Sequence, residues 1–243
     1  MKDNFSGHAA DYARFRPAYP ETLYNFILAN TEGRELAWDC ATGNGQVASE
    51  LSSHFRTVYA TDLSEKQIDN AMRKGNIHYS VQVAEQTSFD DNSIELITVG
   101  QAYHWFDFDR FHNEAKRVLK PGGTVALFGY GLHAVDEKVN ELMHHFYYDI
   151  VGPYWDEERK YIDEQYKNTP FPYLEIACPE FEFTAKWSLD HYIGYIKTWS
   201  AVKHFEKAKG FDPVDDLEKE LRKYWKEELK TIKFPIFLRL GRV

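Results

Sequence analysis

Residues 38–45 read Trp-Asp-Cys-Ala-Thr-Gly-Asn-Gly, and Asp62 lies 17 positions after the last of these glycines. An apolar segment, Leu36 to Cys40, leads into the small residues, and a helix is expected over Gln46 to Phe55. A second apolar segment, Thr57 to Thr61, ends beside Asp62. The pattern predicts a strand–helix–strand unit, with a glycine turn that a ligand can approach and a carboxylate that can bind a ribose. We therefore expect a ligand that contains a nucleoside.

The residues in the turn indicate which nucleoside cofactor binds. Dinucleotide folds use Gly-x-Gly-x-x-Gly, whereas residues 41–45 read Ala-Thr-Gly-Asn-Gly, and the lysine of a triphosphate-binding loop is missing. Asp39 lies two residues before Ala41, and a carboxylate beside the turn repels phosphate but suits an ammonium group. S-Adenosylmethionine carries an ammonium, a carboxylate and a sulfonium but no phosphate. The turn therefore favours this cofactor over a dinucleotide.

In order and spacing, these motifs resemble those of the class I S-adenosylmethionine-dependent methyltransferases, whose first motif reads roughly Asp-x-Gly-x-Gly-x-Gly. The resemblance covers about residues 36–130. It implies that S-adenosylmethionine is the cofactor and S-adenosylhomocysteine the product. No metal is expected, because His133, His144 and His145 lack the spacing typical of metal sites. The positions that match the family's cofactor contacts are Asp39, Ala41, Thr42, Gly43, Gly45, Asp62, Leu63, Ala84, Glu85, Gln101 and Ala102.

Two positions depart from the family pattern. Ala41 replaces the usual first glycine. Alanine adds only a methyl group, which is tolerated at this position if the backbone φ is negative. Val83 stands where relatives often have an aspartate that binds the adenine amine. Adenine recognition is therefore expected from the Ala84 backbone or from Glu85.

Two further segments resemble a small-molecule branch of the family, the type 11 branch, which includes trans-aconitate methyltransferase-like proteins. Residues 12–20 read Tyr-Ala-Arg-Phe-Arg-Pro-Ala-Tyr-Pro, and in that branch the matching segment folds over the cofactor. The resemblance implies that Tyr12 and Arg16 approach the cofactor carboxylate. We expect residues 1–20 to form a lid. Residues 188–201 resemble the same branch and include Trp199.

The candidate acceptor site follows the fourth strand, Ile94 to Val99. His104 lies just beyond this strand, at the carboxyl edge where open α/β sheets bind ligands. It is a candidate general base or acceptor-orienting group, and a packing histidine is the alternative reading. Aromatic residues expected to line the acceptor pocket are Tyr103, Trp105, Phe106, Tyr130 and Trp199.

Composition excludes several other classes of protein. The 243 residues carry a formal net charge of −9, which argues against a nucleic-acid partner. Only two cysteines are present, Cys40 and Cys178, so a disulfide framework is not expected. No run approaches the roughly 20 apolar residues that span a bilayer, and Met1 to Pro20 does not resemble a signal peptide. We expect a cytoplasmic enzyme without a membrane partner; nothing in the sequence indicates its oligomeric state.

The expected fold is α/β: a Rossmann-like, doubly wound sheet of seven mostly parallel strands with the last strand antiparallel. It is expected as one domain, divided into an N-terminal cap (1–34), a cofactor core (35–130), a helical and aromatic acceptor-side insertion (131–179) and C-terminal strands and helices (180–243). Beyond the first unit, periodicity predicts strands at 80–84, 94–99, 124–129, 181–187 and 234–240, and helices at 21–30, 65–74, 133–150, 189–198 and 214–230.

The expected activity is methyl transfer from S-adenosylmethionine to a small organic acceptor, with a carboxylate or hydroxyl oxygen as the preferred target. Such a displacement depends on alignment, and it needs a base only when the nucleophile must lose a proton. Two alternatives stay open. One is a nucleotide-dependent oxidoreductase on the same sheet, and the other is a non-catalytic module that binds the cofactor and regulates a partner.

Overall fold

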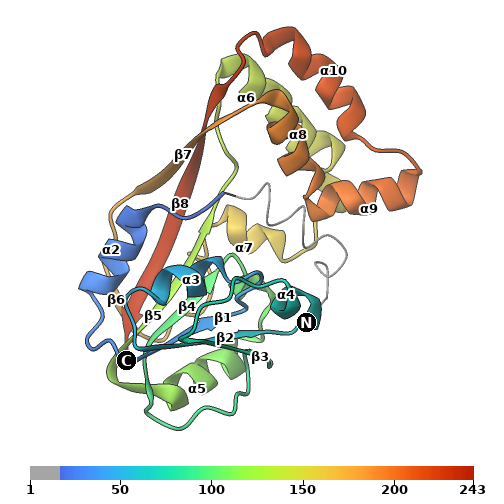
Figure 1. The fold of residues 1–243 in the computed structure, drawn as a ribbon. Helices are drawn as coiled ribbons and strands as arrows, with labels where there is room; N and C mark the ends of the chain where they lie inside the picture. Colours follow the sequence, from blue (N-terminus) through green and yellow to red (C-terminus); the bar gives the residue numbers. More distant parts are fainter. Residues whose placement is uncertain (1–16) are drawn as a thin grey trace.

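The apolar segments of the first half of the chain form the parallel part of a single sheet (Figure 1). The computed structural model describes residues 17–243, so the expected lid and its Tyr12 and Arg16 lie outside the described residues. Five strands run parallel, in the spatial order β3-β2-β1-β4-β5. They are β1 (Leu36–Cys40), β2 (Thr57–Asp62), β3 (Ile77–Val81), β4 (Ile94–Gly100) and β5 (Leu119–Tyr130).

The other edge of the sheet is built from antiparallel pairs around one reversed strand. The long strand β8 (Lys230–Arg242) pairs with β5 on one side. On its other side it pairs with β6 (Leu174–Ile176) at one end and with β7 (Phe181–Trp187) at the other. The sheet is thus seven strands wide, because β6 and β7 follow one another along the same edge. The Rossmann-like, mostly parallel sheet with the last strand antiparallel is confirmed.

Alternate side chains of the central strands enter two separate cores. In β5, Val125 and Leu127 face one core, while Ala126 and Phe128 face the other, as the two-residue period of a strand requires. Helices α2 (Glu21–Ala29) and α3 (Gln46–Leu51) cover one face, and α5 (Phe108–Val118) covers the opposite face. Because both faces are covered, polar ligands can reach the sheet only at the ends of its strands.

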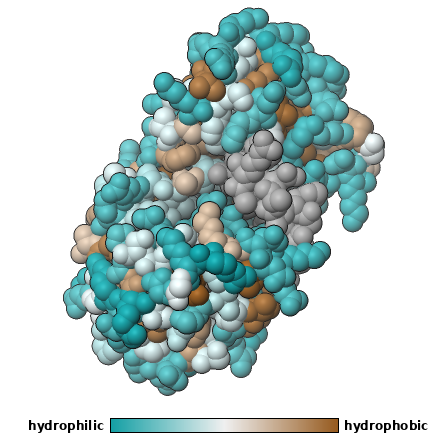
Figure 2. Space-filling view, viewed as in Figure 1, coloured by the Kyte–Doolittle hydropathy of each residue, from teal (hydrophilic) through white to brown (hydrophobic). Residues whose placement is uncertain are grey.

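A helical lobe packs against the far ends of β7 and β8 (Figure 1). Its helices are α6 (Glu137–His144), α8 (Leu189–Lys197), α9 (Ser200–Lys209) and α10 (Val214–Tyr224). The short helix α7 (Arg159–Asp163) lies between this lobe and the sheet, where it contacts the turn η1 (Tyr103–Trp105). Hydrophilic residues cover most of the face that Figure 2 shows. Within residues 17–243, no helix has both the length and the apolar character to cross a membrane.

Several elements differ from the sequence-based expectation. The third strand occupies 77–81 rather than 80–84, because it pairs in register with β2, and residues 82–84 continue into a loop. The expected helix 133–150 begins only at Glu137, where the Asp136 side chain accepts a hydrogen bond from the Val139 amide. Helix α4 (Glu65–Asp69) is shorter than predicted. Strand β6 and helices α5 and α9 had not been predicted.

Candidate active site

A cleft opens at the carboxyl ends of the parallel strands. Its walls come from the β1–α3 turn, the end of β2, the segment after β3 and the end of β4, which meet at one edge of the sheet. Most of the predicted cofactor residues within the described part of the chain line this cleft: Ala41, Thr42, Gly43, Asp62, Leu63, Ala84, Gln101 and Ala102. Asp39, Gly45 and Glu85 lie outside its walls.

Asp39 lies beneath the turn and is almost fully buried. Its Oδ1 accepts a hydrogen bond from the Thr98 hydroxyl at 2.9 Å, and its Oδ2 accepts from the Ala48 amide at 3.0 Å and from the Thr42 hydroxyl. Burial raises the pKa of Asp39 to about 6, although these hydrogen bonds lower it. The structure therefore gives Asp39 a supporting role under the turn instead of a place in the cleft wall.

The three small residues of the turn all have positive φ. Gly43 and Gly45 have φ of 55° and 80°, and Ala41 has φ of 54°. The condition that Ala41 have negative φ is therefore not met, and the alanine adopts the left-handed conformation that its usual glycine would adopt without strain. A Cβ on Gly45 would lie 2.2 Å from Tyr79 Oη, whereas the Cβ position of Gly43 is open. Gly45 thus serves packing, and Gly43 lines the cleft.

Asp62 joins the turn to the end of β2. Its Oδ2 accepts a hydrogen bond from the Gly43 amide at 2.9 Å, and its Oδ1 accepts from the Ser64 amide at 2.8 Å. A carboxylate oxygen can accept more than one hydrogen bond, so the ribose hydroxyls of a bound nucleoside can donate to Asp62. The position at the rim of the cleft fits the ribose role that the sequence predicts.

The side chains expected to recognise adenine differ from the sequence-based expectation. Glu85 points away from the cleft and accepts a hydrogen bond from the Asp107 amide at 3.0 Å. Gln82 and Gln67 line the cleft instead, and Gln67 Oε1 is a buried acceptor without a hydrogen-bond partner among residues 17–243. A buried acceptor without a partner is costly, and an adenine amine or ribose hydroxyl would satisfy it. These polar groups therefore fit an adenosine.

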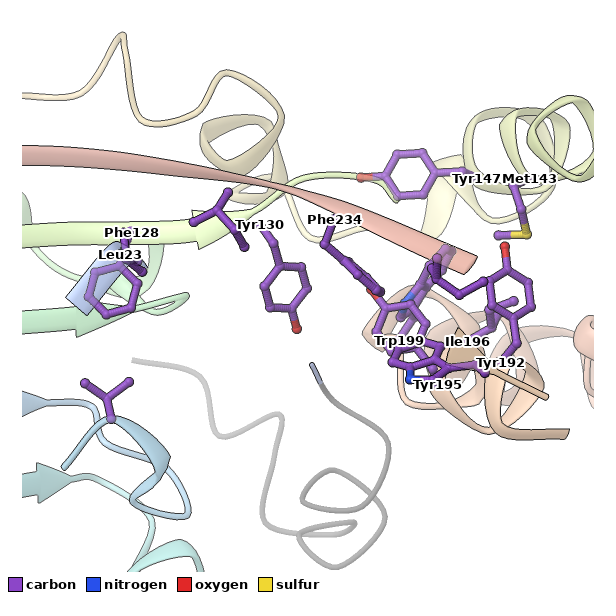
Figure 3. Packing of buried hydrophobic residues seen from close by; sticks show 14 of the residues in the cluster. Leu23, Phe128, Tyr130, Met143, Tyr147, Tyr192, Tyr195, Ile196, Trp199 and Phe234 are labelled. Carbon is purple, nitrogen blue, oxygen red and sulfur yellow. The ribbon is translucent and has the colours of Figure 1, made fainter. Parts of the chain in front are cut away.

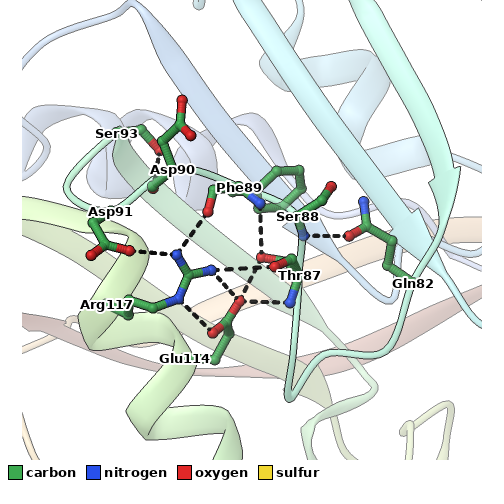
Figure 4. A network of polar contacts seen from close by, with 9 residues as sticks. All are labelled: Gln82, Thr87, Ser88, Phe89, Asp90, Asp91, Ser93, Glu114 and Arg117. Atoms are coloured by element: carbon green, nitrogen blue, oxygen red, sulfur yellow. Dashed lines mark hydrogen bonds and ion pairs between the residues drawn. The ribbon is translucent and has the colours of Figure 1, made fainter.

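A polar network fixes the loop between β3 and β4, on which this end of the cleft depends (Figure 4). The Glu114 carboxylate accepts hydrogen bonds from the Thr87 amide and hydroxyl, both at 2.6 Å, and pairs with Arg117. Gln82 accepts from the Ser88 amide at 2.8 Å. Because Glu114 and Arg117 belong to α5, the network ties the loop to the helix and holds Gln82 beside the cleft.

Gln101 directly follows β4 and separates the cleft from a second cavity. It has φ of 54°, and its side-chain oxygen accepts a hydrogen bond from the Tyr130 amide at 2.8 Å. Left-handed residues other than glycine occur preferentially at functional sites, where surrounding contacts hold them in place. Gln101, Trp105 and Tyr130 line both the cleft and the second cavity, so they form the common wall.

The second cavity, called here the acceptor cavity, lies between η1, α7 and the helical lobe. Figure 3 shows Tyr130 at the end of β5 and, across from it, Tyr195 of α8 and Trp199, which lies between α8 and α9. Two charged groups also belong to its wall, Asp156 and Arg159. The complete lining is Gln101, His104, Trp105, Tyr130, Trp155, Asp156, Arg159, Ile162, Tyr195, Trp199 and Ser200.

His104 lies in η1 and lines the acceptor cavity, but it is 7 % exposed. Its Nδ1 lies 2.9 Å from the Tyr166 hydroxyl, so Nε2 is the ring nitrogen left for a ligand. Burial, assisted by the positive charge of Arg159, lowers the pKa of His104 to about 3. The imidazole is therefore neutral at pH 7 and a weak proton acceptor.

The other predicted acceptor residues divide between three places. Trp105, Tyr130 and Trp199 line the acceptor cavity, whereas Phe106 lines only the cofactor cleft. Tyr103 is buried on the opposite side of η1, and its hydroxyl donates to the Pro170 carbonyl at 2.9 Å. Tyr103 therefore holds η1 against the core and lines neither the cofactor cleft nor the acceptor cavity.

Some of the lining residues were missed at the sequence level. Ser64 and Gln67 begin α4 directly after β2, so their place at the carboxyl edge of the sheet could have signalled them. Trp155 and Arg159 carried no such signal, because they reach the site from a segment without a recognised motif. Within residues 17–243, no group of three or more histidine, cysteine or acidic side chains is arranged to hold a metal ion.

Comparisons with known proteins agree with this geometry. Residues 38–127 match the family described as a methyltransferase domain. A candidate methyltransferase from Dictyostelium discoideum is 32 % identical over 249 residues, which cover 99 % of this chain and 95 % of that protein. An uncharacterized methyltransferase of Mycobacterium bovis is 32 % identical over 130 residues, about half of each chain (52 %).

A solved structure extends the similarity to nearly the whole fold. It is a candidate type II methyltransferase from Anaeromyxobacter dehalogenans, with a TM-score of 0.87 and 36 % identity over 94 % of this chain and 98 % of that one. The chain belongs to the class I S-adenosylmethionine-dependent methyltransferases. It is an enzyme that uses S-adenosylmethionine as its methyl donor, as the turn and Asp62 had indicated.

Proposed function

We propose that the enzyme methylates an oxygen atom of a small organic acceptor that binds in the acceptor cavity. The observation that carries the proposal is the common wall of Gln101, Trp105 and Tyr130 between the cavity and the cofactor cleft. A molecule in the cavity would lie next to one in the cleft, which is the arrangement that a direct displacement needs.

The size and lining of the cavity support a small acceptor. Its volume is about 50 Å³, enough for a few water-sized groups. Tryptophan and tyrosine rings form much of its wall, and they exclude water from a polar group held among them. A small, largely aromatic cavity of this kind suits a metabolite and leaves little room for a polymer.

His104 supports an oxygen acceptor that is already ionised. S-Adenosylmethionine supplies an electrophilic methyl group when bound, so an ionised oxygen can react without a base. A neutral imidazole can donate a hydrogen bond from Nε2 and orient such an oxygen, whereas its lowered pKa makes it a poor general base. We therefore propose that His104 orients the acceptor.

Turnover with a panel of acceptors tests the proposed function. The purified enzyme is incubated with S-adenosylmethionine and small carboxylic acids, phenols, alcohols or amines, and S-adenosylhomocysteine and the methylated product are measured by mass spectrometry. Methyl esters or ethers are expected. Cofactor binding without methyl transfer to any oxygen, or methylation of amines alone, would contradict the proposal.

A variant of His104 separates the two roles predicted for it. If the imidazole orients the acceptor, His104→Gln should raise KM and leave kcat within a few-fold of the wild-type value. A general base should instead lower kcat by roughly 10²–10⁴-fold. Calorimetry with S-adenosylmethionine is the control, because the cofactor cleft should keep its affinity.

A further inference from the structure

We propose that Arg159 binds a carboxylate of the acceptor and that Tyr147 holds its guanidinium in place for this purpose. The inference rests on the proposed function, because it assigns a substrate class to the same cavity. It adds a specificity-determining residue, Arg159, and a positioning residue, Tyr147, which does not itself line the cavity.

Among residues 17–243, hydrogen bonds and ion pairs engage only the Nε edge of the Arg159 guanidinium. Its Nε donates a hydrogen bond to the Tyr147 hydroxyl at 2.7 Å and lies 3.4 Å from Asp163 Oδ1. Its two terminal nitrogens have no hydrogen-bond partner among residues 17–243, although the side chain is only 19 % exposed. Arg159 lines the acceptor cavity. The two terminal nitrogens form the fork that binds a carboxylate through two parallel hydrogen bonds.

The aromatic rings around Arg159 argue against a cationic acceptor. A cage of tryptophan and tyrosine rings can bind an ammonium ion. Here, however, the Arg159 guanidinium already lies over the Trp155 ring, with Cζ 4.5 Å from the ring centroid, and 5.4 Å from that of Tyr147. The cavity thus contains its own cation, and a second positive charge would be repelled. An anionic group is the complementary ligand.

A π-helical segment places Tyr147 where it can hold Arg159. The segment His145–Ile150 continues α6 with a wider turn, in which the Val151 amide bonds to the Phe146 carbonyl at 2.9 Å. Such segments are rare and occur frequently at functional sites. Tyr147 is buried, and its ring packs against those of Trp155 and Trp199, with centroids 5.1 and 5.6 Å away. Its hydroxyl accepts from Arg159 Nε and donates to Asp163 Oδ1 at 2.8 Å.

Two acidic groups set the electrostatic balance of this site. Asp163 lies on the same side as Tyr147, so it orients the guanidinium without blocking the terminal nitrogens. Asp156 belongs to the cavity wall, and its Oδ2 lies 4.0 Å from His204 Nδ1. It would repel an acceptor carboxylate placed beside it and would attract an ammonium. The acceptor carboxylate is therefore expected beside Arg159 and away from Asp156.

Binding measurements test the proposal without requiring turnover. The enzyme is saturated with S-adenosylhomocysteine and titrated by calorimetry with small mono- and dicarboxylic acids, their primary amides and matched amines. At least one acid should bind about 10- to 100-fold more tightly than its amide, as expected for a charge-assisted pair that excludes water. Matched amines should bind no better than the amides.

Three variants identify the groups responsible. Arg159→Gln should abolish the acid-over-amide preference while affinity for the amide and for S-adenosylhomocysteine stays within a few-fold. Arg159→Lys should retain part of the preference, because it keeps the charge but loses the fork. Tyr147→Phe should reduce the preference by about 3- to 10-fold, the effect of one hydrogen bond. Arg56→Gln is the matched control, since it removes an equal charge from an exposed position paired with Glu35.

Specific outcomes would overturn the inference. No preference for acids in the wild-type enzyme, tighter binding of amines, or an undiminished preference in both Arg159 variants would each contradict it. The proposed function can be contradicted independently of this inference. If acids bind through Arg159 but no oxygen is methylated, the carboxylate site stands and the oxygen-methylation proposal is wrong.

Discussion

Two glycines of the cofactor turn should respond differently to the same substitution. Gly43 and Gly45 both have positive φ, so Gly43→Ala and Gly45→Ala share the strain of a left-handed alanine. Their surroundings differ. A Cβ on Gly45 would lie 2.2 Å from Tyr79 Oη and 3.1 Å from its Cζ, whereas nothing lies within 4 Å of a Cβ on Gly43. Gly45→Ala should therefore reduce stability, and Gly43→Ala should reduce cofactor affinity.

The magnitudes follow from these contacts. Left-handed alanine costs about 1–2 kcal/mol, and the stiffer unfolded chain returns about 0.4–1 kcal/mol. Gly43→Ala should thus lower the free energy of unfolding by about 1 kcal/mol. Gly45→Ala adds a steric clash, which costs about 1–3 kcal/mol in a packed region, and gives a total of about 2–4 kcal/mol. Tyr79→Phe should relieve part of that clash in the double variant.

Urea unfolding measures all of these differences in one assay. The four proteins are Gly43→Ala, Gly45→Ala, Tyr79→Phe and the double variant of Gly45 and Tyr79, each compared with wild type at equal m-value. The coupling energy of the double variant should favour stability by about 1–2 kcal/mol. Equal losses for the two alanine variants, or no coupling with Tyr79, would refute the assignment of Gly45 to packing.

Three further results are expected. Asp62→Asn should weaken S-adenosylmethionine binding about 10- to 100-fold in calorimetry, since it removes a charged acceptor from the ribose site, and unchanged affinity would contradict that role. Ala41→Gly should raise the free energy of unfolding by up to about 1 kcal/mol, because it removes left-handed strain, whereas a loss of stability would argue against the conformation at Ala41. Burial lowers the pKa of His104 and His133 to about 3 and that of His112 to about 4, so the unfolded chain binds their protons more readily and stability should fall as pH drops below about 6.5. His133→Gln should reduce this slope by up to about 1.4 kcal/mol per pH unit between about pH 6 and 4. His54→Gln, at the surface, is the control. An equal slope of stability against pH in both variants would contradict the burial of a neutral His133.

Local patterns were enough to predict which residues meet at the cleft beyond the parallel strands. The strands around Asp39 and Asp62 are short apolar runs that end in polar residues. In a parallel sheet, the carboxyl ends of such strands meet at one edge, regardless of how the rest of the chain folds. The orientation of single side chains was harder to predict. Asp39 and Glu85 match family positions, but Asp39 turns under the loop and Glu85 turns toward α5, because backbone amides there require acceptors.

The acceptor half depended on contacts between distant segments. Tyr103 and Trp105 are neighbours in the sequence, yet η1 sends Tyr103 into the core and Trp105 into the cavity wall. The sequence around these two residues has no hydrophobic periodicity that would show which of them faces the core and which faces the cavity. Arg159 lies in a five-residue helix without a recognised motif, and its position depends on Tyr147 in the π-helical segment. Such contacts become visible only in the folded structure.

A crystal structure with S-adenosylhomocysteine bound would test the central claim most directly, that the cofactor cleft and the acceptor cavity form one active site. The ribose hydroxyls should lie within hydrogen-bond distance of Asp62, and the sulfur should lie at the common wall of Gln101, Trp105 and Tyr130, directed toward the acceptor cavity. A sulfur atom directed away from this wall, or a ribose bound elsewhere, would contradict the claim.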